Sequence, residues 1–332
     1  MSTRISVVVP TIGVKESLGE TISSLLKVEG ITEIVVVSNK AITDSSILHD
    51  SRVRVLVAPN LSISEARNLG ITSTTGAIIA FTDDDCVVSE DWVSSVMHLF
   101  EDTKVAIVGG PGITHSTDAP LCKCAGAALE SIVGTYSSSS RYSSRFGEIH
   151  EVGEQNLSTC NIFLRRSILQ TVGYFDRTIY PCEENELIWR IKRRGYRVLY
   201  APNCVVFHHR RRIIRPFLTQ ISSYAKGRAV LTRKYPKSLR LTTAIPSILV
   251  LLILALPFAY FTAKIVFYTL VTTMVAYLTF TFVASLQSTR SSRLSLRFQP
   301  LVWLTIILMH LCYGATLLVA LCKNLMPHAN KT

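Results

Sequence analysis

The hydrophobic and polar positions divide the chain into two kinds of sequence. As far as about Pro236, short apolar runs alternate with mixed polar stretches, whereas from Ala244 to Cys322 the sequence is nearly free of charge except for one short basic interval. In the first part, four short apolar runs predict buried β-strands. These runs are Ile5–Pro10, Ile34–Val37, Val53–Val57 and Ala77–Phe81.

Amphipathic stretches such as Glu16–Lys27 predict helices between these runs. Strands that alternate with helices indicate an α/β fold with a mostly parallel, Rossmann-like sheet, whose ligands bind at the carboxyl ends of the strands. The first part is long enough for one domain with a substantial core. We therefore expect a domain over 1–208, a basic amphipathic segment over 209–242, a helical membrane domain over 243–323 and a tail over 324–332.

Three apolar stretches in the second part have the length of membrane-spanning helices. They cover about 244–263, 265–286 and 301–322, and a span needs about 20 residues. Basic residues precede the first stretch and fill the loop between the second and third, so both places should be cytoplasmic. We expect a multi-pass protein of the cell membrane with its first domain in the cytoplasm and its C-terminus outside. Buried helices of a soluble protein are the disfavoured alternative.

The net charge of +12 is compatible with nucleic acid, anionic lipid or phosphorylated substrates as partners. The densest basic runs, His208–Arg215 and Arg228–Arg240, lie just before the first long apolar stretch, where cytoplasmic headgroups would be. Membrane lipid is therefore the expected partner, and nucleic acid is not. The segment Ile213–Tyr235 interleaves apolar and basic positions, which fits an interfacial helix or a helix packed on the domain. The eight cysteines are scattered, without the spacing of a disulfide framework or a zinc ribbon.

Three adjacent acidic residues, Asp83, Asp84 and Asp85, follow the fourth predicted strand directly. Neighbouring carboxylates repel one another unless a cation neutralises them, and hard oxygen ligands suit Mg²⁺ or Mn²⁺. A divalent ion bound to a diphosphate would fit this position. A solvated turn or a helix N-cap can have the same composition, so the acidic cluster alone leaves its function open.

Eight short strings occur along the chain in the order and spacing of one known family. They are VVVPTIG (7–13), SEARNLGI (64–71), FTDDDC (81–86), GGP (109–111), TCNIFLRRSIL (159–169), GYFD (173–176), CEENELIWRIKRRGYRVLYAP (182–202) and VVFHH (205–209). Over nearly all of residues 4–236 the chain therefore resembles the family-2 glycosyltransferases, whose catalytic domains have the GT-A fold. The resemblance implies metal-dependent, inverting transfer of a sugar from a UDP- or GDP-sugar donor.

The resemblance also implies a role for particular residues. The metal ion, Mn²⁺ or Mg²⁺, would be held by Asp85, Asp83 and His208. The nucleotide sugar would be bound by Pro10, Thr11, Ser38, Asn39, Arg67, Asn68, Asp83 and Asp84. Glu184 would be the general base beside Glu183, and the acceptor side would include Asn161, Trp189 and Arg190. Each type also has an ordinary structural role, because lone histidines and tryptophans are mostly structural and acidic residues cap helices.

Two departures from the family pattern leave details open. Ser38 and Asn39 stand where many members carry an aspartate that reads uracil, so the nucleotide base is not determined. Glu184 is one methylene longer than the usual aspartate, which leaves Glu183 as the alternative base. The oligomeric state does not follow from the sequence.

We expect the acceptor to be a lipid-linked, polyprenyl-borne glycan at the cytoplasmic face, in glycan or polysaccharide assembly. One alternative is the synthesis of a polyprenyl-phosphate monosaccharide, such as a dolichol-phosphate sugar. A second, of another class, is a non-catalytic membrane scaffold. A processive synthase is disfavoured because the Gln-x-x-Arg-Trp motif of such enzymes is not visible.

Overall fold

The structure is a computed structural model that describes residues 4–12, 16–42, 49–145 and 147–323; the expected tail 324–332 lies outside them. The chain divides into two units. As far as they are described, the first comprises Met1–Ser116 and Ser140–His209, and the second comprises Thr117–Ser139 and Arg210–Thr332. Residues 117–139, which the sequence analysis included in the first domain, thus group with the C-terminal helices.

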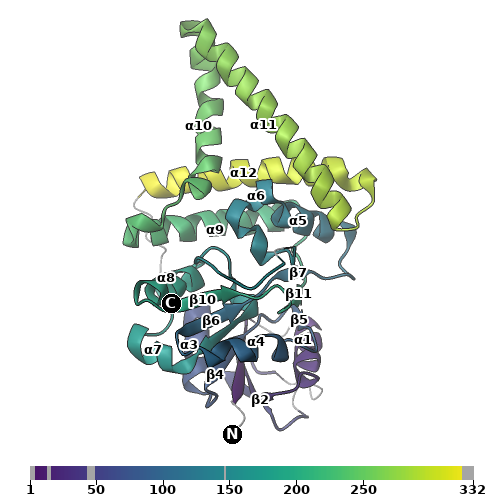
Figure 1. Cartoon of the computed structure of the whole chain (residues 1–332). Helices are drawn as coiled ribbons and strands as arrows, with labels where there is room; N and C mark the ends of the chain where they lie inside the picture. The colour runs from purple at the N-terminus through teal and green to yellow at the C-terminus, as the bar shows by residue number, and fades with distance from the viewer. Residues whose placement is uncertain (1–3, 13–15, 43–48, 146, 324–332) are drawn as a thin grey trace. The chain divides into compact units, whose positions relative to one another are not determined.

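An eight-stranded sheet forms the centre of the first unit, in the order β3-β2-β1-β4-β9-β6-β10-β8 (Figure 1). Its strands are β1 (Ile5–Thr11), β2 (Ile31–Ser38), β3 (Val53–Val57), β4 (Ile78–Phe81), β6 (Val105–Gly109), β8 (His150–Glu151), β9 (Ile162–Arg165) and β10 (Arg197–Tyr200). Strands β1 to β4 pair in parallel, whereas β9 runs antiparallel between β4 and β6. The four predicted strands and the mostly parallel α/β fold are confirmed.

Helices on both faces bury this sheet. They are α1 (Glu16–Leu26), α3 (Ile63–Thr72), α4 (Ser94–Met97), α7 (Arg166–Val172) and α8 (Glu183–Arg193), with the 3₁₀ turns η1 (His98–Glu101) and η3 (Thr159–Asn161). A further 3₁₀ turn, η2 (Tyr136–Arg141), spans the division between the two units. Side chains alternate along β1, so Val7 and Val9 join one hydrophobic cluster and Val8 joins the other. A strand covered on both faces needs apolar residues at nearly every position, which explains the uninterrupted apolar runs.

A second, three-stranded sheet joins segments that are far apart in the sequence. It consists of β5 (Cys86–Val88), β11 (Val206–His208) and β7 (Gly112–Thr114), with β11 in the middle. Strand β11 runs antiparallel to β5, with His208 opposite Cys86, and parallel to β7. The acidic residues that precede β5 therefore lie next to the end of β11.

The second unit is helical. It contains α5 (Pro120–Glu130), α6 (Ile132–Thr135), α9 (Arg215–Lys234), α10 (Leu241–Thr262), α11 (Lys264–Ser291) and α12 (Gln299–Cys322), with the short turns η4 (Pro236–Ser238) and η5 (Leu296–Phe298). Three segments are long and apolar enough to cross a membrane, namely Leu241–Thr262, Lys264–Ser291 and Leu296–Cys322. The three predicted apolar helices are thus confirmed within the part of the chain that the structure describes.

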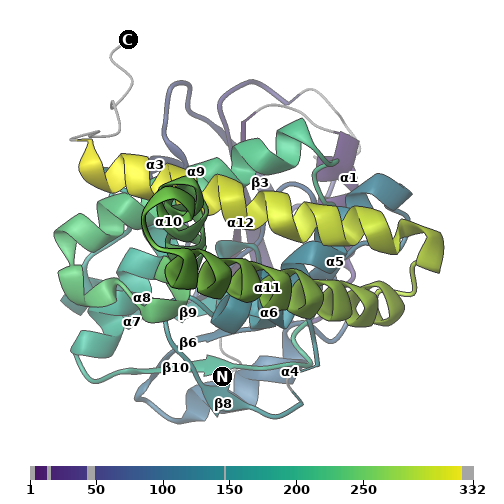
Figure 2. The same ribbon diagram turned by 90° about the horizontal axis from the view of Figure 1, so that it is seen from above.

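The long helices of the second unit do not run side by side as a bundle. Helices α10 and α11 form a hairpin, and α12 lies across its base (Figure 1). In Figure 2, α10 is seen end-on while α12 runs across the view. At the crossing, Ser247 Oγ of α10 donates to the carbonyl of Gly314 at 3.2 Å. A Cβ at Gly314 would lie 2.1 Å from the carbonyl oxygen of Pro246, so glycine permits this close approach.

Helix α12 also packs along α9. Ala225 and Ala229 of α9 form a hydrophobic cluster with Leu317 and Ala320 of α12. Small residues on α9 let the two helices approach closely, as is common in helix pairs within membranes. Within the second unit, α12 therefore lies between α9 and the base of the hairpin.

We predict that Gly70→Ala lowers the free energy of unfolding by about 1–3 kcal/mol, the usual cost of overpacking a core. Gly70 lies inside α3, and a Cβ there would be 2.3 Å from Cγ1 of Val8, a stiff β-branched side chain in the buried strand β1. Gly19, inside α1, is the matched control, because its Cβ would meet nothing within 4 Å. Gly19→Ala should stabilise by about 0.5–1 kcal/mol. Chemical unfolding of the two variants checks this, and equal stability would contradict it.

Candidate active site

Of the three carboxylates in the acidic loop after β4, one has a structural role and two are partly exposed to solvent. Asp84 is 5% exposed and accepts a hydrogen bond from Thr11 Oγ1 at 2.5 Å, which fastens the loop to the end of β1. The side chains of Asp83 and Asp85 are each 30% exposed. The first and third acids of the Asp-Asp-Asp sequence can therefore reach a ligand, whereas the middle one holds the loop.

Asp83, Asp85 and His208 form a group with the donor atoms of a metal site. Each offers one ligand atom, and these atoms all lie within 4.8 Å of one another. His208 Nε2 is 3.2 Å from Asp85 Oδ1, because the pairing of β5 with β11 brings the end of β11 beside the acidic loop. Two carboxylates and one imidazole suit Mn²⁺ well, and Mg²⁺ through the carboxylates. The three residues that the sequence analysis assigned to the metal thus come together and fit such an ion.

Arg67 connects this loop to the acidic start of α8. Its helix, α3, begins with a capping box between Ser62 and Glu65. The guanidinium, only 4% exposed, approaches Asp83 Oδ1 at 3.2 Å through Nη2 and donates to Glu183 Oε1 through Nη1. Carboxylates about one hundred residues apart in the sequence therefore share one buried cation.

Burial shifts the protonation of both carboxylates. It raises the pKa of Asp83 to about 6, although the charge of Arg67 acts in the opposite direction. Burial likewise raises the pKa of Glu183, again against the effect of Arg67. Glu183 Oε2 is buried and has no hydrogen-bond partner among the described residues. Arg67 therefore opposes the effect of burial on both carboxylates but does not cancel it.

Glu184, the predicted base, is positioned by an arginine that the sequence analysis missed. Arg141 Nη1 donates to Glu184 Oε1 at 3.2 Å, and Nη2 donates to Asn185 Oδ1 at 3.2 Å. The same guanidinium bonds the carbonyls of Glu154 and Gln155. Arg141 lies in a serine-rich stretch without periodicity or motif, so only the fold reveals that it fixes the Glu184 side chain.

The predicted nucleotide-binding residues at the ends of β1 and β2 lie at one edge of the sheet. The parallel register pairs Pro10 with Val37 and Thr11 with Ser38. Asn39 follows directly, and its amide donates to the carbonyl of Thr11 at 3.4 Å. Asn39 Oδ1 is buried without a hydrogen-bond partner among the described residues. Asn39 Oδ1 is therefore a hydrogen-bond acceptor that no described residue uses, at the edge of the sheet where ligands of parallel strands commonly bind.

Three other predicted residues are engaged within the protein. Asn68 exchanges hydrogen bonds of 2.8 and 3.0 Å with the backbone of Phe175. Asn161 is fully buried; it accepts from Trp92 Nε1 and donates to two carbonyls. Arg190 pairs with Glu186 and bonds the carbonyls of residues 172–174. Trp189, on α8, is half-buried. Ligand contacts of these residues stay predictions from the sequence.

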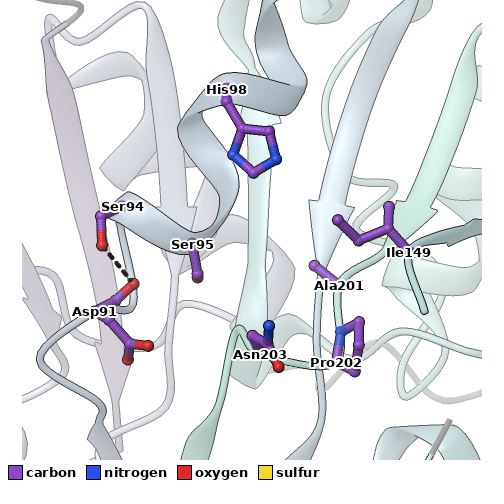
Figure 3. A pocket seen from close by; sticks show the side chains of 8 residues that line it. All are labelled: Asp91, Ser94, Ser95, His98, Ile149, Ala201, Pro202 and Asn203. Carbon is purple, nitrogen blue, oxygen red and sulfur yellow. Dashed lines mark hydrogen bonds between the residues drawn. The ribbon is translucent and has the colours of Figure 1, made fainter. Parts of the chain in front are cut away.

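A pocket of about 300 Å³ lies elsewhere in the first unit (Figure 3). It is lined by Asp91, Ser94, Ser95, His98, Ile149, Ala201, Pro202 and Asn203. None of the predicted metal, nucleotide or catalytic residues is among them. The pocket is therefore separate from the group around Arg67.

Comparison with known proteins identifies the family. Residues 6–173 match the family described as glycosyl transferase family 2, which is half of the chain. The chain belongs to glycosyl transferase family 2. The fold of this family-2 chain is also found in a solved structure, the mannosyltransferase PcManGT of Pyrobaculum calidifontis in complex with GDP-mannose and Mn²⁺. The two share 15% identity with a TM-score of 0.58, over 95% of this chain and 86% of that one. The predicted family and GT-A fold are thereby confirmed.

Curated relatives cover parts of this family-2 chain. A pre-mycofactocin glycosyltransferase of Mycobacterium tuberculosis is 26% identical over 182 residues, which is 52% of this chain and 35% of the relative. An O-antigen chain rhamnosyltransferase, RfbN, of Salmonella typhimurium is 27% identical over 146 residues, 43% of this chain and 44% of the relative. The chain spans less than half the length of either relative.

We predict that Arg67→Ala lowers the free energy of unfolding by about 3–5 kcal/mol, the typical cost of removing one partner from a buried ion pair. A raised carboxyl pKa means that the fold prefers the protonated form. Stability is therefore lost as the pH rises from the ordinary pKa of 4.5 through the folded pKa of Glu183. Without Arg67 this folded pKa lies higher, so the destabilisation should be larger above neutral pH than in mild acid. Chemical unfolding at several pH values measures it.

Arg177 is the matched control, because its side chain is 75% exposed and its Nη1 lies 3.8 Å from Glu65 Oε1. Arg177→Ala should change stability by no more than about 1 kcal/mol. Adding Glu183→Gln to Arg67→Ala should restore part of the lost free energy of unfolding. If Arg67→Ala alone lost less than about 1 kcal/mol at every pH, the proposed stabilising role of Arg67 would be refuted.

Proposed function

We propose that this chain transfers a sugar, with inversion, from a nucleotide-sugar donor to a lipid-linked glycan at the cytoplasmic face of the membrane. The observation that carries the proposal is the Arg67 bridge, since it joins the metal-binding acids to the acid pair on α8. Metal-dependent transfer requires both groups around one reacting centre. Membership of the family and the GDP-mannose and Mn²⁺ in the solved mannosyltransferase support it.

The donor half of the proposed site consists of the acidic loop and the edge formed by β1 and β2. Asp83, Asp85 and His208 would hold the divalent ion, whose charge, when it is bound, stabilises the departing nucleoside diphosphate. Asp84 keeps the loop fastened to Thr11, so the two flanking acids stay in position. We propose that Asn39 Oδ1, a buried hydrogen-bond acceptor, receives a hydrogen bond from the nucleoside. Both UDP- and GDP-sugars remain candidate donors.

The acceptor half of the proposed site centres on Glu184. We assign it the role of general base, which takes the proton from the acceptor hydroxyl as that oxygen attacks the anomeric carbon. The bond from the anomeric carbon to the diphosphate breaks in the same displacement, and inversion of configuration follows. Arg141 orients the carboxylate through one oxygen. Glu183 remains paired with Arg67 and acts as a positioning residue.

The three long apolar helices favour an acceptor that is itself held in the membrane. The O-antigen chain rhamnosyltransferase, whose name refers to glycan assembly, supports a lipid-linked glycan over bare polyprenyl phosphate. A polyprenyl-phosphate monosaccharide synthase would use the same anchor and is the second candidate. A scaffold without catalysis would not need the donor atoms of Asp83, Asp85 and His208 beside the acidic pair.

We predict that Glu184→Gln lowers kcat by about 10²-fold or more, because the amide cannot accept the proton, while the temperature of unfolding stays unchanged. Asp85→Ala should remove the dependence on Mn²⁺ together with most of the transfer. The assay combines the purified full chain and labelled nucleotide sugars with either a lipid-diphosphate sugar or polyprenyl phosphate.

Asp91→Asn, at the separate pocket, is the control and should retain full activity. Activity in Glu184→Gln but not in Glu183→Gln would show that Glu183, and not Glu184, is the general base. A product formed only with bare polyprenyl phosphate would reject the proposed acceptor, and unimpaired turnover in both Asp85→Ala and Glu184→Gln would reject the site.

We further propose that α10 and α11 cross the membrane as a hairpin. With a rise of 1.5 Å per residue, the 22 residues of α10 extend about 33 Å and the 28 residues of α11 about 42 Å. Both lengths suffice for a hydrocarbon core of about 30 Å. Aromatic rings surround the turn at Lys264, namely those of Tyr260, Phe261, Phe267 and Tyr268. Such rings are typical of a membrane–water interface, which supports the turn as the far end of the hairpin.

The contacts of α12 favour a position along the cytoplasmic interface rather than a third crossing. At its end, Arg233 of α9, in the basic segment before α10, donates to the carbonyls of Ala320, Leu321 and Lys323. At its start, Gln299 Nε2 donates to Ser285 Oγ of α11 at 2.8 Å. Both ends of α12 thus contact segments that lie next to cytoplasmic basic residues. We therefore propose a cytoplasmic C-terminus, in place of the external one expected from the sequence.

Reporter fusions to the full chain test this topology. Green fluorescent protein after Thr332 should fluoresce and alkaline phosphatase there should be inactive, because the former matures in the cytoplasm and the latter outside it. Alkaline phosphatase inserted between Ala263 and Lys264 is the control and should be active. An active phosphatase at the C-terminus would place the C-terminus outside the cytoplasm and would show that α12 crosses the membrane.

A further inference from the structure

Two consecutive histidines at the end of β11 face different acidic groups. His208 Nε2 lies 3.2 Å from Asp85 Oδ1, on the side of the proposed donor site. His209 Nε2 lies 3.2 Å from Glu20 Oε2, on α1. Successive side chains of an extended strand point to opposite faces, which explains this division. His209 is fixed by its backbone amide, which donates to the carbonyl of Asp85 at 3.0 Å.

The pairing of β11 with β7 brings a second imidazole beside His209. In the parallel register His208 pairs with Thr114, so the next residues, His115 and His209, are neighbours just beyond the ladder. The amide of His115 donates to the carbonyl of His208 at 3.3 Å. The ring centroids of His115 and His209 are 4.3 Å apart. The two imidazoles are therefore held together by backbone geometry.

Glu20 reaches both imidazoles from α1. Its Oε1 is 3.8 Å from His115 Nε2, and its Oε2 is 3.2 Å from His209 Nε2. One ligand atom from each residue lies within 4.8 Å of the others. The exposed fractions of the side chains are 12% for His115, 27% for His209 and 49% for Glu20. Solvent and ions can therefore reach a group that three separate elements preorganise.

We propose that Glu20, His115 and His209 bind a divalent transition metal ion of the zinc class. Two imidazole nitrogens and one carboxylate are a donor set that zinc uses with three protein ligands, and a water completes the tetrahedron. The two nitrogen donors select against Mg²⁺, which prefers oxygen ligands. The group on the other side of β11, Asp83, Asp85 and His208, has two carboxylates and one imidazole and therefore suits a harder ion. The ion would tie α1, β7 and β11 together and so brace the strand that presents His208. The site does not depend on the proposed transfer reaction.

Cobalt is a suitable probe, because Co²⁺ replaces Zn²⁺ at such sites and absorbs visible light. We use the full chain in detergent with Asp83→Asn and Asp85→Asn, which weakens the other metal group. This protein should bind one equivalent of Co²⁺ with the absorption of a nitrogen–oxygen site, and Zn²⁺ should displace it. Adding His115→Ala or His209→Ala should weaken binding by about 10-fold or more, in line with the sensitivity of metal sites to their ligands. Glu20→Gln should have a smaller effect in the same direction.

His98→Ala, at a histidine outside this group, is the matched control and should bind like the parent. Unfolding temperatures without metal establish that each variant is folded. The proposal is overturned if the parent binds no cobalt, or if His115→Ala and His209→Ala bind it equally well while folded. An intense thiolate-to-cobalt band that Cys160→Ser removes would also overturn it, because the ion would then lie among Cys86, Cys160 and His208, which form another group of possible ligands.

Discussion

The arrangement of the candidate active site depends on one buried cation, the guanidinium of Arg67. It is held between Asp83 and Glu183, which belong to the loop after β4 and to the first turn of α8. Without it, the buried Glu183 and the partly buried Asp83 would lack a compensating charge, and burial would raise their pKa values further. With it, the rise in both pKa values is limited. The helix that carries Arg67 packs against β1 through Gly70, so the packing of the sheet decides where the charge lies.

The sequence predicted well those features that repeat along the chain. Strands buried on both faces require continuous apolar runs, and β1 to β4 were therefore recognisable. The acids at the end of β4 were recognisable as possible metal ligands from their position, whereas His208 came from a resemblance, and the fold brings them together. Arg141 was not predictable, because its importance comes from contacts with two distant segments, residues 154–155 and 184–185, and from no local pattern. The partners of Asn161 and Arg190 are likewise backbone carbonyls, which a sequence motif does not distinguish from ligands.

Hydropathy identified α12 as a long apolar helix but does not decide whether it crosses the membrane. A helix that packs on α9 along one side and on the base of the hairpin along the other needs apolar residues nearly all around. A helix that crosses the bilayer needs the same composition. The two cases differ only in contacts, such as those between Arg233 and the last carbonyls of α12. Length and composition are therefore sufficient to predict membrane affinity and insufficient to count crossings.

The length of the α10–α11 hairpin relates the proposed anchor to the thickness of a bilayer. The extra length of α11 lies in its polar end, Gln287–Ser291, so the apolar parts of both helices extend about 33 Å, little more than a hydrocarbon core of about 30 Å. A hairpin that crosses the bilayer as proposed therefore has little length to spare and stands nearly upright. In a thick, sterol-rich bilayer the aromatic turn would be drawn below the headgroups at an energetic cost. Thinner bilayers avoid that cost, so lateral sorting should concentrate this protein in them.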